Sequence, residues 1–433
     1  LVGSEMCIRD SISIVVILLT EMFEIKNKGM IVLCAAIFVS FPTVVSSFAY
    51  MYTADAYLLA FLLATLAVYL TWCVKKWGTI AGMVCLAFAM GIYQAYATVA
   101  IVLVLLYIIR QFVIEKLDFL EAVRKDLKYL GMLVGGAVLY AVILKITLIR
   151  YNITLPGYQG IGALGIMSLG QYKAALQKTL YHFRLILGME HGVEKRVYSI
   201  LNASVLLLIG LIFIYLLIRN QVYKKKMSML ASIAAVCLIP VGAYFINFTS
   251  PDVQYYTLME MAVCLIYLLM IIMLLQLDWK TWISKILKGC GIFVLCGLVY
   301  YNVINCNIAY FNMNLSYHKS ISIAEDVLQR IEQMDEFQNQ HDKVVIMGDY
   351  NCATENLQIM MPSIMGISND SFLNDSYHYT IIWNYCFGVQ MEQASYDEMM
   401  EIVETDEYKN MSVYPLKGCV EYINGIIVVK MQE

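Results

Sequence analysis

The chain has 433 residues, of which 61% are hydrophobic and only 15% are charged, and its net charge is −3. Soluble globular domains carry about 25% charged residues, so this composition excludes an ordinary soluble protein and predicts that lipid surrounds most of the chain. The nearly balanced charge gives no indication of nucleic-acid binding.

Residues 1–11 are predicted to be foreign to the fold. The run from Ser4 to Ser11 (SEMCIRDS) resembles a translated sequencing adapter, and the apolar run that follows, 11–23, is only a partial span. The segment also lacks the basic start and the small-residue cleavage site of a signal peptide. We therefore expect an N-terminally truncated fragment.

Apolar runs close to membrane length follow one another along the chain. They cover residues 30–49, 55–74, 78–93, 97–114, 129–149, 199–218, 228–246, 254–276 and 288–308. A helix needs about 20 apolar residues to cross a bilayer, and an open sheet cannot satisfy its backbone there. Residues 12–310 are therefore predicted to form a polytopic α-helical membrane protein, with about nine full spans plus one partial span.

Lysine and arginine fall in alternate loops. They gather near 26–28, 75–76, 110–128, 219–226 and 280–288, whereas the short loops at 50–54, 94–96 and 247–253 contain none. By the positive-inside rule, the basic loops are cytoplasmic and the others face outward. This predicts a multi-pass membrane protein with a long outer loop at 150–198 and an extracytoplasmic C-terminal domain.

The second half of the outer loop is predicted to be a helix. Over residues 168–187, one stripe contains Tyr172, Leu176, Leu180, Phe183 and Leu187, and the cations Lys173, Lys178 and Arg184 lie off it. This pattern is typical of a helix in the membrane interface. Such a helix would cover the ends of the spans, and its cations could also attract a lipid phosphate.

Residues 316–433 have a soluble composition and predict a small α/β domain. Residues 321–334 have the period of an amphipathic helix, whereas Lys343–Met347 and Thr380–Phe387 are typical of strands. Asn424-Gly425 fits a type I′ hairpin turn between two further strands. Asp349, after the first strand, is either an ordinary strand-end carboxylate or a ligand-binding residue.

The outer ends of the predicted spans collect polar and aromatic residues. They are Tyr50, Tyr52, Asp55, Tyr57, Tyr93, Gln94, Tyr96, Lys145, Arg150, Asp252 and Glu260. Tyrosines at this depth often form an interfacial belt. Combined with amide and carboxylate groups they also suit a sugar site, because sugar hydroxyls need polar partners and sugar ring faces stack on aromatic rings.

Asp55 is the candidate catalytic residue, because an ionisable group at a membrane boundary is costly to keep there. The candidate substrate-binding residues are Tyr52, Tyr57, Tyr93, Gln94, Tyr96, Arg150, Asp252 and Glu260. A structural alternative is that Asp55 only caps a helix beginning at Ala56, since Asp is a favoured N-cap residue. The histidines show no metal-ligand spacing, so each is interpreted as a surface residue and no metal site is predicted.

Three short segments resemble the GtrII-type bacterial glucosyltransferases, which are polytopic membrane enzymes of the wider GT-C class. They are Phe41-Pro42, the run from Tyr50 to Tyr57 (YMYTADAY) and the run from Gly91 to Tyr96 (GIYQAY). The resemblance covers roughly residues 30–310, and the closing hairpin at 424–430 is similar as well.

The resemblance implies that glucose moves from a polyprenyl-phosphate donor in the bilayer to a surface polysaccharide such as an O-antigen-like glycan. No nucleotide cofactor is expected, and a need for a divalent cation is left open. A carboxylate could deprotonate the acceptor hydroxyl, and Arg or Lys could stabilise the departing phosphate. GT-C enzymes carry the key carboxylate in the first outer loop, expected upstream of residue 12, so Asp55 is the best acidic residue in this chain. Its role as base, acceptor ligand or metal ligand stays open.

Two other functions compete with glucosyl transfer. A flippase or exporter of lipid-linked sugars would need polar or broken helices near the middle of the membrane. A membrane-anchored scaffold would bind glycan through residues 316–433 and leave the spans without chemistry.

Overall fold

The computed structural model describes residues 2–155, 165, 167–186, 196–337, 342–350, 373 and 375–431. Within these residues the chain divides into two compact units, of which the first runs to Cys306 and the second starts at Asn307.

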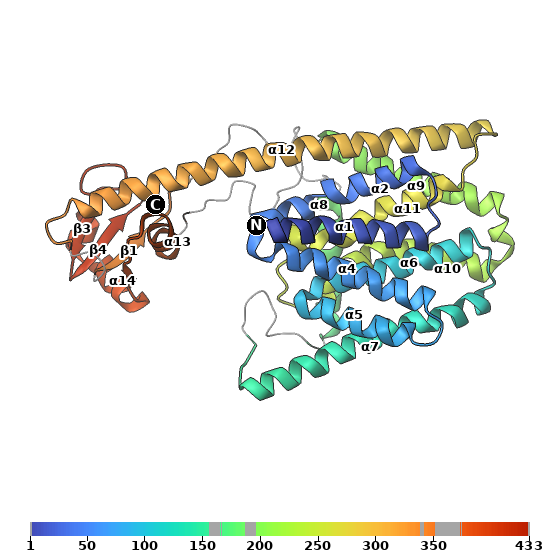
Figure 1. The fold of residues 1–433 in the computed structure, drawn as a ribbon, viewed down its shortest axis with the longest axis horizontal. Coiled ribbons are helices and arrows are strands. Elements are labelled where there is room, and N and C mark those ends of the chain that lie inside the picture. The colour runs from blue at the N-terminus through green and yellow to red at the C-terminus, as the bar shows by residue number, and fades with distance from the viewer. Residues whose placement is uncertain are drawn as a thin grey trace. The chain divides into compact units, whose positions relative to one another are not determined.

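The first unit is a bundle of helices (Figure 1). Its α-helices are α1 (Val2–Met22), α2 (Lys28–Ser40), α3 (Pro42–Ala49), α4 (Met51–Cys73), α5 (Gly78–Ile92), α6 (Ala97–Val113), α7 (Phe119–Tyr151), α8 (Leu169–Ile186), α9 (Arg196–Arg219), α10 (Lys226–Ala243), α11 (Cys264–Leu275) and the first part of α12 (Trp282–Glu332). Short 3₁₀ segments, η1 (Gln94–Tyr96), η4 (Val222–Lys224), η5 (Phe245–Phe248) and η6 (Thr257–Val263), connect them.

Seven helices in the described residues are long and apolar enough to cross a membrane: α4, α6 with η1, α7, α9, α10, α11 with η6, and α12. The pair α2–α3, bent by 40°, makes an eighth. Pro42 explains the bend, because it occupies the first turn of α3 and holds Phe41 extended. The predicted runs lie mostly in helical segments, although the run 30–49 is divided between α2 and α3, and α5, with 15 residues, is shorter than the other candidate spans.

The N-terminal helix is longer than the sequence predicts. The residues expected to be foreign and those of the partial span belong to one continuous helix, α1, which starts at Val2. Among the described residues, α1 is not one of the helices that are long and apolar enough to cross a membrane.

The helices differ in which surfaces they bury. Helix α11 is buried along almost its whole length, as expected of a helix that is apolar on all sides. Helix α7 instead leaves Leu130, Val138 and Ile146 more than half exposed. An exposed apolar stripe of this length is typical of a surface that faces lipid or a partner.

The basic loops meet at one end of the bundle. Arg110 pairs with Glu24 at 2.9 Å, Lys225 with Asp118 at 2.9 Å, and Arg219 with Asp278 at 3.0 Å. Each pair joins loops that are far apart in sequence. Because consecutive spans alternate in direction, the loops at 50–54, 94–96 and 247–253 belong to the opposite end.

The second unit contains a four-stranded sheet with strand order β2-β1-β4-β3. Its strands are β1 (Lys343–Met347), β2 (Glu392–Gln393), β3 (Val420–Ile423) and β4 (Ile426–Lys430), and its helices are the last part of α12, α13 (Ser376–Ile382), the π-helix η7 (Trp383–Phe387), α14 (Tyr396–Glu404) and α15 (Asp406–Asn410). Strand β1 is parallel to both β2 and β4, whereas β3 and β4 are antiparallel.

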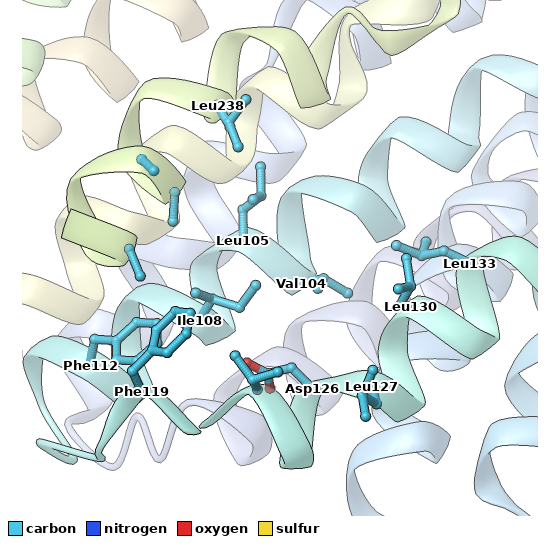
Figure 2. A pocket seen from close by; sticks show the side chains of 14 residues that line it. Val104, Leu105, Ile108, Phe112, Phe119, Asp126, Leu127, Leu130, Leu133 and Leu238 are labelled. Carbon is cyan, nitrogen blue, oxygen red and sulfur yellow. The ribbon is translucent and has the colours of Figure 1, made fainter. Parts of the chain in front are cut away.

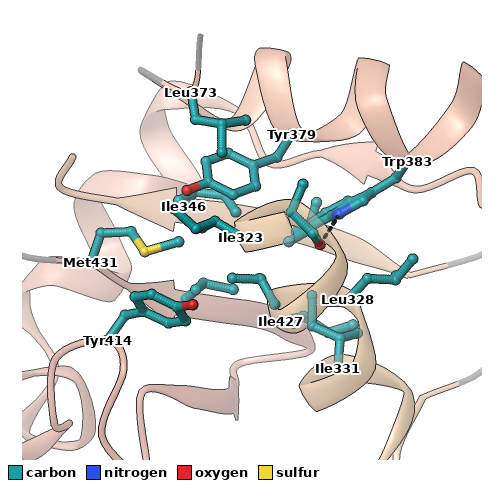
Figure 3. Close-up of a cluster of buried hydrophobic side chains, with 14 of the residues drawn as sticks. Ile323, Leu328, Ile331, Ile346, Leu373, Tyr379, Trp383, Tyr414, Ile427 and Met431 are labelled. Carbon is teal, nitrogen blue, oxygen red and sulfur yellow. Dashed lines mark hydrogen bonds between the residues drawn. The ribbon is translucent and has the colours of Figure 1, made fainter. Parts of the chain in front are cut away.

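Two apolar clusters cover the two faces of this sheet. On one face, Ile346 and Ile427 pack with Ile323 of α12 and with Trp383, whose indole Nε1 donates to the carbonyl of Ala324 at 2.8 Å (Figure 3). On the other face, Val345 and Val428 pack with Ile402 of α14. Alternate residues of β1 and β4 therefore pack into opposite clusters, and this is why the sequences of both strands are continuously apolar.

Two sequence predictions for this unit have opposite outcomes. The Asn-Gly hairpin is confirmed, because Asn424 (φ 53°) and Gly425 (φ 83°) both adopt the positive φ of a type I′ turn. The strand predicted at Thr380–Phe387 is wrong, since this segment is helical in α13 and η7. Asp375 caps α13 by accepting a hydrogen bond from the His378 amide, and this local cap outweighs the β-propensity of the following residues.

Candidate functional site

Three predicted tyrosines lie together at the end of the bundle opposite the basic loops. The rings of Tyr57 and Tyr93 are 5.2 Å apart, and those of Tyr93 and Tyr96 are 6.1 Å apart. Tyr57 comes from the second turn of α4, whereas Tyr93 precedes and Tyr96 ends η1, the short connection between α5 and α6. The structure therefore joins two segments that are separate in sequence.

A small apolar cluster joins these tyrosines to the segment that carries Glu260. Its buried members are Ala95, Ile246, Val253 and Met259, and Tyr93, Tyr255 and Tyr256 pack against it. Met259 immediately precedes Glu260 on η6. The connection between α5 and α6 therefore packs against η5 and against the segment that carries Glu260.

Asp55 lies inside α4 and not at its start. The helix begins at Met51 with Tyr50 as its N-cap residue, so the prediction that Asp55 caps a helix beginning at Ala56 is wrong. Its Oδ1 accepts from the amide of Ala56 at 2.8 Å. The carboxylate is half-buried, and within the described residues it forms no ion pair. Asp55 stands two residues before Tyr57 on α4, at the same end of the bundle as the tyrosine cluster, and the two side chains leave the helix on different sides.

Glu260 lies on an irregular piece of backbone. The segment η6 is a seven-residue 3₁₀ run, which is longer than this tighter helix usually extends and is typical of a strained or functional region. The broken helix α2–α3 packs against it, and the Thr43 hydroxyl donates to the Thr257 carbonyl at 2.8 Å. Glu260 itself is half-buried and has no ion pair among the described residues.

Helix α8 is fastened to the loop that precedes η6. Asn247 donates from Nδ2 to the Thr179 hydroxyl at 3.2 Å, and Lys178 donates from Nζ to the Val253 carbonyl. Burial lowers the pKa of Lys178, and the nearby Asp252 carboxylate opposes that shift. The predicted helix is confirmed, and Leu176 and Leu180 are exposed on its other face. Phe183 of the predicted stripe instead packs edge-on against Tyr244, and Leu187 lies outside the described residues.

An aromatic cluster at this end was not predicted from the sequence. The His182 ring lies 4.6 Å from Tyr255 and 6.0 Å from Tyr244, and the two tyrosine rings are 4.8 Å apart. Burial, and then the charges of Tyr244 and Glu260, raise the pKa of Tyr255 well above its usual value. His182 is half-buried, so its interpretation as a surface residue is wrong. His182 lies on the side of α8 opposite the apolar stripe, and this position in the sequence could have indicated that its ring faces the bundle.

Comparison with known protein families decides the class of this protein. The model of the glucosyl transferase GtrII family matches residues 11–251. The chain belongs to this family. The chain is therefore a glycosyltransferase, as predicted. No curated protein and no solved structure matches the chain.

The matched region of this GtrII family member includes Asp55, the tyrosine cluster and α8, and it ends just before Asp252. Glu260 lies beyond it. The structure thus adds a carboxylate to a surface that the family match only partly covers.

Other predicted site residues are distributed more widely. Tyr52 is 84% exposed, whereas Tyr96 is only 1% exposed. Gln94 donates from Nε2 to the Tyr140 hydroxyl of α7 at 2.8 Å. Arg150 is exposed on α7, ten residues and about 15 Å of helix beyond Tyr140. Asp252 is exposed beside Lys178.

The described part of the chain holds no group of three His, Cys, Asp or Glu residues arranged to bind a metal ion. The predicted residue Asp349 follows β1 and Gly348, whose φ is 83°.

Proposed function

We propose that this glycosyltransferase moves glucose from a polyprenyl-phosphate donor to a surface glycan, such as an O-antigen-like polysaccharide, on the outer face of a bacterial membrane. The GtrII family match supports the sugar and the reaction class. The seven apolar helices and the exposed stripe of α7 support a membrane setting, because hydrocarbon is the solvent in which such surfaces are stable.

The observation that carries the proposal is that two carboxylates without ion pairs lie at the same end of the bundle as one group of tyrosines. Asp55 shares α4 with Tyr57, the Tyr57 ring contacts the Tyr93 ring, and Tyr93 packs on the cluster that contains Met259, the residue before Glu260. These residues lie opposite the basic loops, which the positive-inside rule assigns to the cytoplasm. A lipid-phosphate donor presents its sugar at such a membrane boundary.

The residue types at this end suit glycosyl transfer. Asp55 would act as the general base that takes the proton of the acceptor hydroxyl, a role that contributes about 10²–10⁴-fold to rate. The rings of Tyr57 and Tyr93 would bind a sugar face, and Glu260 would accept hydrogen bonds from sugar hydroxyls. Cations at this end, Lys178 and Arg150, would favour the departing phosphate.

The irregular backbone near Glu260 supports a binding site at the same place. Backbone that departs from the α-helix within a membrane bundle is tolerated where protein buries it or where it lines a cavity, and broken helices often carry substrate sites. Here the α2–α3 break and η6 lie against each other. The same feature would also suit a flippase, but membership of a glucosyl transferase family favours transfer over both a flippase and a scaffold.

Two isosteric substitutions test the proposal in the purified full chain. Asp55→Asn should lower the rate of glucose transfer from polyprenyl-phosphate glucose by about 10²-fold or more, since it removes the base. Glu260→Gln should mainly raise the KM. The matched control is Glu121→Gln, which changes an exposed acid at the opposite end. Unchanged transfer in Asp55→Asn would remove Asp55 from the chemistry.

A further inference from the structure

Helix α5 is shorter than the hydrocarbon core of an ordinary bilayer. Its 15 residues, Gly78–Ile92, rise by about 22 Å, whereas the core is about 30 Å thick. Groups that favour the membrane boundary stand at both ends, with the exposed Lys76 and Trp77 before the helix and with Tyr93 and Gln94 after it. The apolar length of α5 therefore falls about 8 Å short of the core.

One face of α5 lies on the surface of the bundle. Ile80 is 51% exposed, Val84 39% and Phe88 62%, and a spacing of four residues places them on one stripe. Gly91 continues this stripe, and a side chain added there would meet no described atom within 4 Å. The stripe holds no charged residue, and the boundary groups at its two ends match the two faces of a bilayer. Lipid is therefore the occupant that suits this surface.

The other faces of α5 are fixed between α4 and α7. A Cβ atom at Gly82 would lie 2.7 Å from the Ala67 carbonyl oxygen of α4, and one at Gly136 of α7 would lie 2.9 Å from the Leu86 side chain. Glycines at such positions let helices approach closely and interlock. Helix α5 is therefore held at one height in the bundle and does not slide towards either face of the bilayer.

The basic ends of these helices share one level. Only a four-residue turn separates α4 from α5, and Lys128 of α7 donates from Nζ to the Thr71 carbonyl near the end of α4 at 2.8 Å. Close by, Asp126 is the one ionisable group among the described residues that line a cavity of about 390 Å³ between α6, α7 and α10, and Leu130 and Leu133 follow it along α7 (Figure 2). The apolar parts of α4, α5 and α7 therefore begin near the same level.

At the other end, α4 and α7 continue past the level at which α5 ends. Gln94 donates to the Tyr140 hydroxyl of α7 at 2.8 Å, so the end of α5 lies close to the level of Tyr140. Helix α7 extends eleven residues, or about 16 Å of helix, beyond that point to Tyr151. Tyr57, whose ring contacts that of Tyr93, likewise lies six residues, or about 9 Å, inside the start of α4. The tyrosines therefore lie below the level at which these longer spans end.

Thinning of the bilayer is the accommodation that this geometry favours. A span that is too short is otherwise matched by flanking residues that reach for the headgroups, or by association with another copy. Here Gln94 is bonded to Tyr140, and the ring of Tyr93 contacts that of Tyr57, so both are already engaged within the bundle. We propose that the bilayer is thinner beside α5 than around the rest of the bundle, and that its headgroups descend there to the level of Tyr93 and Gln94.

The thinning has a consequence for the transfer of glucose. In an undisturbed bilayer the tyrosines would stand about 9 Å or more below the headgroups, a depth that a charged sugar phosphate does not enter. With the headgroups lowered beside α5, a lipid-phosphate donor presents its sugar to Tyr57 and Tyr93 while its hydrocarbon chain stays in the bilayer. This consequence rests on the proposed function, whereas the thinning itself does not.

The depth of an added tryptophan tests the thinning in the full chain, reconstituted in phosphatidylcholine vesicles. Phe88→Trp lies on α5, eleven residues from Trp77, and the matched control Leu207→Trp lies at a 63% exposed position of α9, twelve residues from Arg219. Quenching by lipids brominated at different acyl carbons gives each depth, after subtraction of the signal of the unsubstituted chain. Phe88→Trp should lie about 6 Å closer to the headgroups than Leu207→Trp. Equal depths would overturn the proposal, as would a Phe88→Trp that no lipid quenches because a second copy covers the stripe.

A second variant on α5 gives a result that does not depend on α9. Val84→Trp lies one turn closer to the basic end than Phe88→Trp, on the same exposed stripe. In a bilayer thinned to about 22 Å, Phe88→Trp is the shallower of the two, because α5 ends one turn beyond it. In a core of about 30 Å, Phe88→Trp is the deeper of the two, and that order would contradict the thinning.

The thickness of the bilayer tests the consequence for transfer. Lengthening the acyl chains of the vesicle lipids from 18 to 22 carbons opposes thinning, so the rate of glucose transfer from polyprenyl-phosphate glucose should fall about fivefold. The same protein returned to detergent micelles is the control and should regain its rate. A rate that does not depend on chain length would overturn the access of the donor beside α5. Absence of transfer at every thickness would instead refute the proposed function, and the tryptophan depths would still decide whether the bilayer is thinned.

Discussion

Asp55 and Glu260 are half-buried acids that form no ion pair within the described residues. Keeping a carboxylate in such a setting opposes folding, so residues of this kind usually persist because they act. Replacing such an acid by its neutral amide is therefore expected to raise the stability of the protein and to lower its activity. The two acids differ in position, because Asp55 is on a regular helix and Glu260 on a 3₁₀ segment.

We expect Glu260→Gln to stabilise the protein while it impairs transfer. Removing the charge relieves the cost of desolvation, so the free energy of unfolding should rise by about 1 kcal/mol. Thermal unfolding in detergent measures this. Glu121→Gln, which breaks an exposed pair with Lys125 at 2.8 Å, should leave the unfolding temperature nearly unchanged. A lower unfolding temperature for Glu260→Gln would mean that this carboxylate is held by contacts that stabilise it.

The tyrosine pair makes a second prediction at this scale. Tyr93→Phe keeps the ring that stacks on Tyr57 and should retain most of the transfer activity. Tyr93→Ala removes it and should lower kcat/KM about tenfold, because aromatic stacking contributes about 0.5–1.5 kcal/mol. Tyr300→Ala, which removes a 70% exposed ring on α12, serves as control. Equal activities of the Phe and Ala variants would argue against sugar stacking here.

At the scale of elements, α8 is positioned by polar contacts and leaves its apolar stripe outside. Thr179 is fully buried and accepts from Asn247, so Thr179→Val should weaken the docking of α8 by about 1 kcal/mol. Hydrogen exchange of the α8 amides should accelerate about fivefold. Thr147→Val is the matched control, since the Thr147 hydroxyl bonds only to its own helix. Unchanged exchange in Thr179→Val would show that other contacts hold the helix.

The second unit predicts a pH dependence. Lys343 and Glu398 pair at 2.6 Å, and this pair, with the backbone amide of Ser395, lowers the pKa of Glu398 to about 2 from an ordinary 4.5. Because the folded-state pKa is depressed, the stabilisation is complete above about pH 4.5 and is lost as the pH falls towards about 2.

The protection of the β1 amides in the full chain, measured as the exchange rate relative to the intrinsic rate at the same pH, should therefore fall as the pH is lowered through that window. Glu398→Gln should remove this dependence, whereas Asp397→Asn, which changes the exposed neighbour, should keep it. A Glu398→Gln profile that still follows the wild type would assign the effect to other acids.

At the scale of the whole molecule, the sequence predicts contacts that are local and misses those that are not. Apolar runs locate most of the helices because each run is one long segment of local structure, and Asn424-Gly425 locates a hairpin because both residues adopt positive φ. The parallel pairing of β1 with β4 and the stacking of Tyr57 on Tyr93 join distant segments. Helix α4 starts at Met51, four residues before Asp55, so the alternative interpretation of Asp55 as a cap is wrong.

The arrangement of the basic loops predicts the orientation of the bundle. A cysteine at Gln254, an exposed position in the loop before η6, should react with a membrane-impermeant thiol reagent in intact cells. A cysteine at Lys280, in the basic loop, should react only after the cells are opened. The unsubstituted chain gives the background of the native cysteines. The reverse pattern would invert the proposed orientation.

The central claim is that glucose transfer occurs at the end of the bundle that holds Asp55, Tyr93 and Glu260. The most direct measurement uses sealed vesicles with one orientation, polyprenyl-phosphate glucose in the bilayer and the glycan acceptor on one side only. Transfer should require the acceptor on the side where a cysteine at position 254 is labelled, and Asp55→Asn should abolish it. Transfer to an acceptor confined to the side of the basic loops would contradict the account.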